Sequence, residues 1–152
     1  MSIIERDIEY SIDNQLTKLG WILDHKNPKR NVFTQRPKTN DEKVKLKRLQ
    51  PDYVLYANSQ SNKSTLIIEA KKPNQPLIKA LDQAKNYAEK LGTPIVIATD
   101  GYRLKTWHMT NNAPLFLNEN EIDELISPEQ NIDFVKGNIH QSFGGFSNVK
   151  KN

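Results

Sequence analysis

The chain has 152 residues and a formal net charge of +4 at pH 7, with 36% hydrophobic and 26% charged residues. This composition predicts one compact domain with an adequate core and a polar surface. The absence of cysteine excludes disulfides, cysteine nucleophiles and thiolate zinc sites, and without a signal peptide or membrane-spanning stretch we expect a cytoplasmic location.

The first predicted element is a helix from Ile4 to Leu19. Its apolar side chains recur at helical spacing and form one stripe, made of Ile4, Ile8, Ile12, Leu16 and Leu19. Glu5 and Glu9 border this stripe. The ordinary interpretation of such acids is an exposed charged flank, and the functional one is assistance to a neighbouring site.

Residues 26–48 concentrate positive charge, with nine Lys or Arg against two acids. The basic residues are Lys26, Lys29, Arg30, Arg36, Lys38, Lys43, Lys45, Lys47 and Arg48. Such runs are usually solvated loops, but this one precedes an acidic strand and could draw a DNA backbone toward it. We therefore expect the last four of these cations to contact DNA phosphates.

Two apolar segments, 53–57 and 65–70, flank a polar loop and predict an antiparallel hairpin. Strand side chains alternate, so Glu69 and Lys71 leave the same face. Two registers place Asp52 opposite Glu69 or Lys71, and a third turns it away. The loop is too long to fix the register by turn type, so the sequence permits a carboxylate pair beside an ammonium without establishing it.

These side chains have the chemistry of a metal-dependent nuclease. Two carboxylates, the Ala70 backbone carbonyl and waters form the oxygen environment that Mg²⁺ prefers, and Mn²⁺ can substitute. A cation held by Asp52 and Glu69 would polarise a phosphodiester, while Lys71 would orient or deprotonate the attacking water. The alternative is an ordinary surface salt bridge between Glu69 and Lys71, because this loose spacing often arises by chance.

Residues 77–91 predict an amphipathic helix that ends at Gly92. Gln83 and Tyr87 are four positions apart and stack at the edge of its apolar face, where an amide and a phenol could reach into a cleft over the acidic strand. The plainer interpretation is a solvated glutamine and a half-buried tyrosine.

The remaining segments predict a hairpin and an acidic helical region. An Asp100–Gly101 turn joins residues 94–99 to 102–109 and should extend the sheet. Residues 117–135 contain six acids and no Lys or Arg, which makes a poor DNA face. Asn118 with Glu121 predicts a helix start there, and we interpret the segment as structural or motor-facing.

Six segments together resemble the nuclease domain at the amino end of the restriction subunit of type I restriction-modification enzymes, in the PD-(D/E)xK superfamily. They are residues 19–21, 31–37, 51–56, 68–73, 83–88 and 100–107. The resemblance covers most of the chain. It implies an α/β restriction-endonuclease-like core, with a mixed central sheet flanked by helices, over residues 1–142. We expect residues 143–152 to be a linker-like tail leading to an absent motor domain.

The resemblance also implies roles for residues. It assigns the catalytic core and a Q-x-x-x-Y motif to Asp52, Glu69, Lys71, Gln83 and Tyr87. It further implies a metal-assisting acid on the first helix, for which Glu5 is the first choice, by its distance from residues 20–21, and Glu9 the second.

The implied activity is Mg²⁺-dependent hydrolysis of phosphodiester bonds in double-stranded DNA. The sequence lacks a Gly-x-x-x-x-Gly-Lys-Ser/Thr loop, so ATP would act only in a helicase-like motor domain of the same polypeptide. The modification and specificity subunits are the other implied partners, and no membrane is. Two alternatives stay open: a catalytically inactive DNA-binding or assembly module, and a stand-alone nuclease of the same superfamily.

Overall fold

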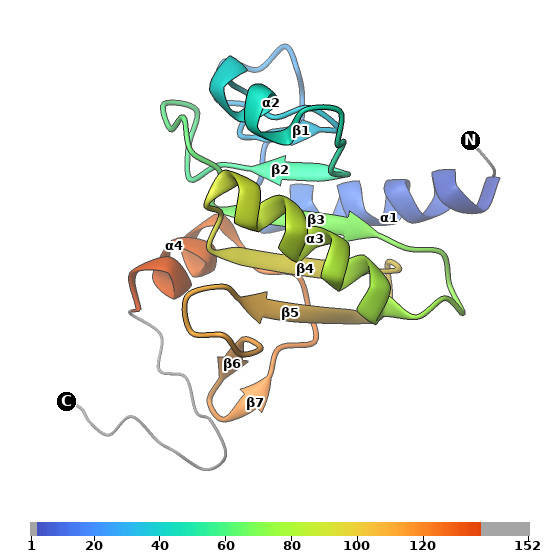
Figure 1. The fold of residues 1–152 in the computed structure, drawn as a ribbon. Helices are drawn as coiled ribbons and strands as arrows, with labels where there is room; N and C mark the ends of the chain where they lie inside the picture. Colours follow the sequence, from blue (N-terminus) through green and yellow to red (C-terminus); the bar gives the residue numbers. More distant parts are fainter. Residues whose placement is uncertain (1–2, 138–152) are drawn as a thin grey trace.

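The computed structural model describes residues 3–137, in which helices cover both faces of a five-stranded sheet (Figure 1). In chain order the elements are α1 (Ile3–Leu19), β1 (Val32–Thr34), α2 (Asn40–Leu46), β2 (Tyr53–Leu55), β3 (Leu66–Ala70), α3 (Leu77–Leu91), β4 (Ile95–Thr99), β5 (Leu104–His108), β6 (Phe116–Leu117), β7 (Asn120–Glu121) and α4 (Pro128–Lys136). None of the helices in this part of the chain is long and apolar enough to cross a membrane. The predicted linker-like tail, residues 143–152, lies outside the described residues.

The sheet is mixed, as predicted, with the strand order β1-β2-β3-β4-β5. Strand β3 runs parallel to β4, and the other neighbouring strands are antiparallel. Both predicted hairpins, β2–β3 and β4–β5, are confirmed. Tyr53 pairs with Ile68, so the next pair outward is Asp52 with Glu69. The register that the sequence left open is therefore the one that brings the two acids together.

Side chains that alternate along the strands explain why helices pack on both faces of the sheet. The buried apolar side chains of α1 and α4 pack on a face that includes Leu66 and Ile68. Those of α3 pack on the opposite face, which includes Ile67 and Val96. Successive strand residues point to opposite faces, so an uninterrupted apolar run in β3 serves both layers. The prediction that helices cover both faces is confirmed.

The helix start predicted at Asn118 is wrong. Asn118 and Glu119 have positive φ values of 53° and 68° and form the turn between β6 and β7. Asn adopts this left-handed region more readily than most residues, so the same residue type suits a tight hairpin turn as well as a helix cap. The helix begins later, at Pro128, where Ser127 and Gln130 form a capping box.

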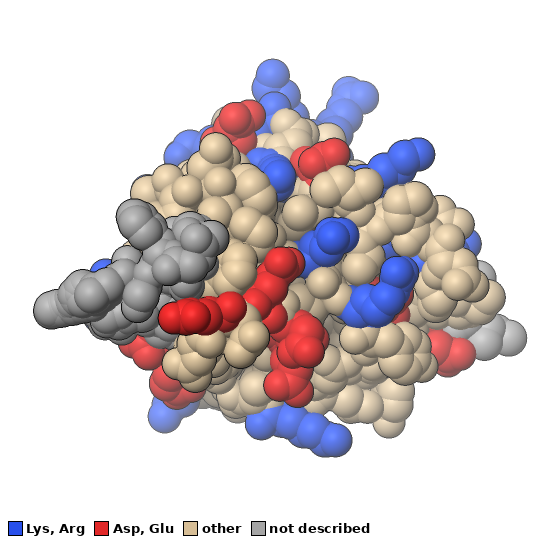
Figure 2. All heavy atoms as spheres, turned by 90° about the horizontal axis from the view of Figure 1, so that it is seen from below, with Lys and Arg blue, Asp and Glu red and all other residues tan. Residues whose placement is uncertain are grey.

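The acidic segment forms its own surface beyond the β5 edge of the sheet. Figure 2 shows acidic side chains near the middle of the face seen from below, where β6 and β7 lie. Glu121, Asp123 and Glu124 are exposed and line a hollow there. That this face is a poor surface for DNA stays a prediction from the sequence.

The basic segment contains two elements that the sequence did not predict, β1 and α2. Thr39 caps α2 by accepting a hydrogen bond from the Glu42 backbone N–H. Glu42 itself is only 3% exposed. Its Oε1 accepts from the Tyr56 hydroxyl at 2.7 Å, and its Oε2 accepts from the Ser64 backbone N–H and hydroxyl, each at 3.0 Å. A buried acid thus fastens α2 to the β2–β3 hairpin.

Candidate active site

Asp52 and Glu69 face each other where β2 begins and β3 ends. The Asp52 backbone N–H donates to Glu69 Oε1 at 2.7 Å, and the Ala70 backbone N–H donates to Asp52 Oδ2 at 2.7 Å. Each carboxylate therefore accepts a hydrogen bond from the backbone of the opposite strand. These reciprocal bonds fix both side chains on a rigid part of the sheet.

The electrostatics of this pair are unfavourable while both groups are charged. Burial, followed by the negative charge of Asp52, raises the pKa of Glu69 to about 8. Burial also raises the pKa of Asp52, against the lowering effects of the Ala70 N–H, Glu69 and Lys71. Glu69 is 4% exposed, so water does little to screen the repulsion. Such a pair favours holding a proton or binding a cation.

Lys71 follows β3 directly and lines a cleft together with Asp52, and its charge acts on both Asp52 and Glu69. The cleft has a volume of about 370 Å³ and is lined by Glu5, Ile8, Glu9, Asp52, Ala70, Lys71, Lys72 and Gln75. The Lys71 backbone N–H donates to the Thr99 carbonyl at 2.9 Å, which fixes the residue beside β4. The structure thus brings together Asp52, Glu69 and Lys71, which the sequence singled out.

The two candidate helper acids on α1 differ in their surroundings. Both line the cleft, but Glu5 Oε1 lies 3.7 Å from Lys72 Nζ in an ion pair. The pKa of Glu9 is raised, first by burial and next by the charge of Asp52. Glu9 therefore lies in the field of the Asp52 carboxylate. This geometry favours the sequence's second choice over its first.

Sequence reasoning missed a contact that places α1 over the acids. The Tyr53 hydroxyl donates to Asp13 Oδ1 at 2.7 Å, and Tyr53 is the residue next to Asp52. Burial, followed by the hydrogen bond to Asp13, raises the pKa of Tyr53 well above its ordinary range. The only sequence signal was that Asp13 lies at the border of the α1 apolar stripe. This pattern is too common to identify Asp13 as the partner of Tyr53.

Gln83 and Tyr87 are joined to each other on α3. Gln83 Nε2 donates to the Tyr87 hydroxyl at 2.8 Å. The plainer interpretation made the tyrosine half-buried, but it is only 3% exposed. Burial and then the charge of Glu69 raise the pKa of Tyr87 to about 12. Neither residue is among those that line the cleft, so they approach the acid pair from the α3 side of the sheet instead of reaching into the cleft.

The cleft offers hard oxygen donors from both strands and from α1. Within residues 3–137, no three His, Asp or Glu side chains are already gathered into a metal site. The nearest approach to one is the pair of carboxylates Asp52 and Glu69, with Glu9 beside them and the Ala70 backbone in the same cleft. This donor chemistry fits a magnesium-type cation and no soft metal.

Comparison with known proteins gives a consistent result. Residues 2–114 match the family described as type I restriction enzyme R protein N terminus (HSDR_N). Among solved structures, a fragment described as an HsdR subunit of a type I restriction enzyme from Vibrio vulnificus YJ016 has a similar fold, with a TM-score of 0.62 and 20% identity over 90% of this chain. The chain spans 27% of that structure's chain. A search of curated proteins found no match.

Proposed function

Since the chain belongs to the family of type I restriction enzyme R protein N termini and has its α/β restriction-endonuclease-like fold, we propose that it is a nuclease domain hydrolysing phosphodiester bonds of double-stranded DNA. The observation that carries this proposal is the facing pair of half-buried Asp52 and buried Glu69, whose pKa is raised, with the charge of Lys71 acting on both. Like-charged buried acids beside a lysine are costly for folding and are typical of catalytic sites.

The acid pair is the proposed magnesium site. Asp52 and Glu69 would hold the ion, with the Ala70 carbonyl and Glu9 as further oxygen donors. Glu5, the first choice from sequence, is less suited because it already forms an ion pair. When bound, Mg²⁺ supplies Lewis-acid polarisation of the phosphate and lowers the pKa of a nearby water. Mn²⁺ offers the same chemistry.

The remaining residues position the reacting groups. Lys71 places a positive charge in the cleft, where it can orient the attacking water or stabilise negative charge on the phosphate. Tyr87, whose pKa is raised to about 12, keeps its proton at neutral pH. With Gln83 it forms a neutral hydrogen-bonding pair on the α3 side of Glu69. We assign these two as positioning residues.

The domain would act as one part of a larger assembly. Its proposed partners are DNA, a helicase-like motor domain of the same polypeptide, and the modification and specificity subunits. ATP would be used by the motor, and sequence recognition would lie in another subunit. This division follows from the family and from the 27% coverage of the similar structure, not from contacts within this chain.

The decisive experiment compares Glu69→Gln with Glu129→Gln, an exposed acid on α4, in the assembled enzyme. Glutamine keeps the acceptor oxygen for the Asp52 N–H but removes the charge. Cleavage of circular plasmid DNA with Mg²⁺ should be lost in the first variant and unchanged in the second. Full cleavage by Glu69→Gln, or wild-type cleavage in chelator, would refute the proposal.

A further inference from the structure

A separate hollow lies between the loops on either side of α2. It has a volume of about 240 Å³, and no Asp or Glu lines it. Its lining residues come from the segments 35–37 and 43–50 and include four cations, Arg36, Lys43, Lys47 and Arg48. We call this feature the basic groove.

The structure divides the basic segment into engaged and available cations. Lys45 Nζ pairs with Asp41 at 3.1 Å, Lys38 Nζ donates to two loop carbonyls at 2.6 and 2.7 Å, and the Arg30 guanidinium lies 3.9 Å from the centre of the Phe33 ring. By contrast, none of the four groove cations forms an ion pair with an acid within residues 3–137. Their charge is therefore available to an anion.

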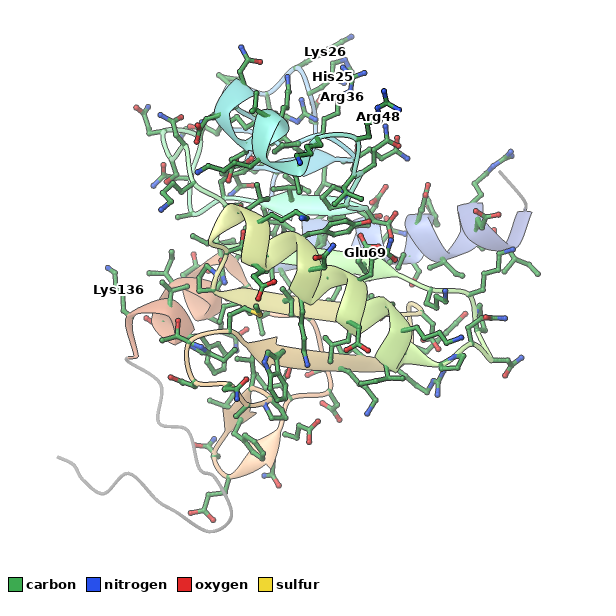
Figure 3. All side chains as sticks on the ribbon, viewed as in Figure 1. His25, Lys26, Arg36, Arg48, Glu69 and Lys136 are labelled. Carbon is green, nitrogen blue, oxygen red and sulfur yellow. The ribbon has the colours of Figure 1, made fainter. Side chains whose placement is uncertain are left out.

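The groove adjoins the chain segment that carries Asp52. The Gln35 backbone N–H, in the groove lining, donates to the Asp52 carbonyl at 3.2 Å, and Gln50 in the same lining is two residues before Asp52. Figure 3 shows Arg36 and Arg48 on the loops beside α2, above the end of β3 that carries Glu69. A chain of phosphates crossing the groove would therefore pass close to the cleft.

The groove is also held in shape. Leu46 in its lining is 1% exposed and packs in the cluster that joins α3 to the sheet. At the other end of α2, Glu42 is hydrogen-bonded to Tyr56 and Ser64. Because the scaffold is fixed before a ligand arrives, little conformational entropy of the backbone is lost on binding.

We propose that the basic groove binds the phosphate backbone of duplex DNA and sets the path of the strand into the neighbouring cleft. Guanidinium groups bind phosphate oxygens in a bidentate manner, and unpaired cations release counterions when they contact DNA. The proposal rests on the proposed function only for what happens in the cleft, because binding requires neither cleavage nor metal. The groove includes Arg36 and does not include Lys45, which pairs with Asp41.

The test measures binding of the full chain to duplex DNA by fluorescence anisotropy in chelator, over a series of salt concentrations. One variant carries Gln at Arg36, Lys43, Lys47 and Arg48. The control has the same change in charge at four exposed lysines elsewhere, Lys18, Lys63, Lys90 and Lys105. The groove variant should lose about 0.9 from the log–log salt slope for each phosphate contact removed. The control should keep nearly the whole slope.

Several outcomes separate the possibilities. Equal losses in the two variants would overturn the proposal, because they would show a general effect of net charge. Unchanged DNA binding with lost assembly of the restriction complex would also overturn it and assign the groove to a protein partner. The single variant Arg48→Gln should lower the log–log salt slope by about 0.9, the value for one phosphate contact. Its thermal melt shows whether the substitution causes a folding defect. Because binding is measured in chelator and cleavage with Mg²⁺, full cleavage by Glu69→Gln would refute the proposed function and leave the groove standing. An unchanged salt slope in the groove variant would refute the groove and leave the proposed function standing.

Discussion

Two of the buried acids within residues 3–137, Glu42 and Glu69, lie in environments with opposite effects on a negative charge. Glu42 is 3% exposed and accepts hydrogen bonds from Tyr56 and Ser64. Glu69 is buried beside the half-buried Asp52, and the negative charge of Asp52 raises the pKa of Glu69. Burial of an acid is therefore not evidence of a catalytic site by itself. The like-charged neighbour and the open cleft distinguish the functional pair.

The Glu42 network has a structural purpose that follows from its partners. Ser64 Oγ is also hydrogen-bonded to Thr93 Oγ1 at 2.6 Å, so the network joins α2, the β2–β3 hairpin and the turn after α3. All its donors are neutral, and they satisfy both carboxylate oxygens. The acid pair likewise bonds to the backbone, but its repulsion remains, and only a proton or a cation relieves it.

The largest expected effect is on DNA cleavage, and it distinguishes the acid pair from Glu42. Asp52→Asn should lower DNA cleavage by about 10³-fold or more, because it removes a proposed metal ligand while its side-chain oxygen can still accept from the Ala70 N–H. Glu42→Gln should cleave at nearly the wild-type rate. Plasmid cleavage by the assembled enzyme measures both, and magnesium titration calorimetry should show weaker binding only for Asp52→Asn. Equal loss in both variants would mean that the two acids have the same structural role.

A second prediction separates the ligands from the lysine in the cleft. Lys71→Met should lower cleavage by about 10²-fold, in the range expected for a group that assists proton transfer. The carboxylates remain, so magnesium binding should be retained, in contrast to Asp52→Asn. Calorimetry and single-turnover cleavage would be measured on the same preparations. Loss of magnesium binding in Lys71→Met would show that the lysine supports the fold of the site and not the reaction.

A third prediction concerns stability. Glu42→Ala should lower the free energy of unfolding by about 2–3 kcal/mol, because it leaves the hydroxyl of Tyr56 and the N–H of Ser64 without their buried acceptor. Glu42→Gln should cost less, since one acceptor oxygen remains. Urea denaturation in chelator measures both, with Asp41→Ala, an exposed neighbour, as the control. A stability of Glu42→Ala equal to that of Asp41→Ala would contradict the structural assignment.

The fourth prediction uses pH to detect repulsion in the acid pair. A carboxyl whose pKa is raised by folding binds its proton more tightly in the folded state, so it favours folding at low pH. For Glu69, this stabilisation is complete below the unfolded value near 4.5 and is lost as pH rises toward about 8. Metal-free wild type should therefore lose stability over this range, and Glu69→Gln should show a flatter profile.

The same pH series provides its own controls. The raised pKa values of Asp52 and Glu9 act in the same direction, so the Glu69→Gln profile should be flatter but not flat. Saturating Mg²⁺ should flatten the wild-type profile as well, because bound metal competes with the proton. Identical slopes in chelator for wild type and Glu69→Gln would show that Glu69 carries no unfavourable charge.

The sequence predicted the acid pair better than its surroundings. Alternation within β3 placed Glu69 and Lys71 on one face, but the polar loop at 58–64 left the register open, and only packing of the strands resolved it. Glu42 could not be assigned, because its partners Tyr56 and Ser64 lie 14 and 22 positions away. A carboxylate in a basic run looks solvated until the fold shows what covers it.

The smallest expected effect concerns the pair on α3 and tests whether it supports the acids or only the helix. Tyr87→Phe removes the hydroxyl that lies in the field of Glu69 but keeps the buried ring, and Gln83→Ala removes an exposed side chain whose amide donates to that hydroxyl. Both should fold like wild type. Cleavage should fall by about 10-fold in Tyr87→Phe and less in Gln83→Ala, since the hydroxyl remains there.

Magnesium affinity is the readout that a purely structural role would not change. If the hydroxyl orients Glu69, Tyr87→Phe should weaken magnesium binding while its thermal melt in chelator stays near that of wild type. Tyr102→Phe is the matched control, because it removes a hydroxyl from a side chain that is 82% exposed. Weakened magnesium binding in Tyr87→Phe, but not in Tyr102→Phe, would show that the α3 pair supports the acid site. A lowered melting temperature with unchanged magnesium affinity would show that the pair only stabilises the fold, as Glu42 does.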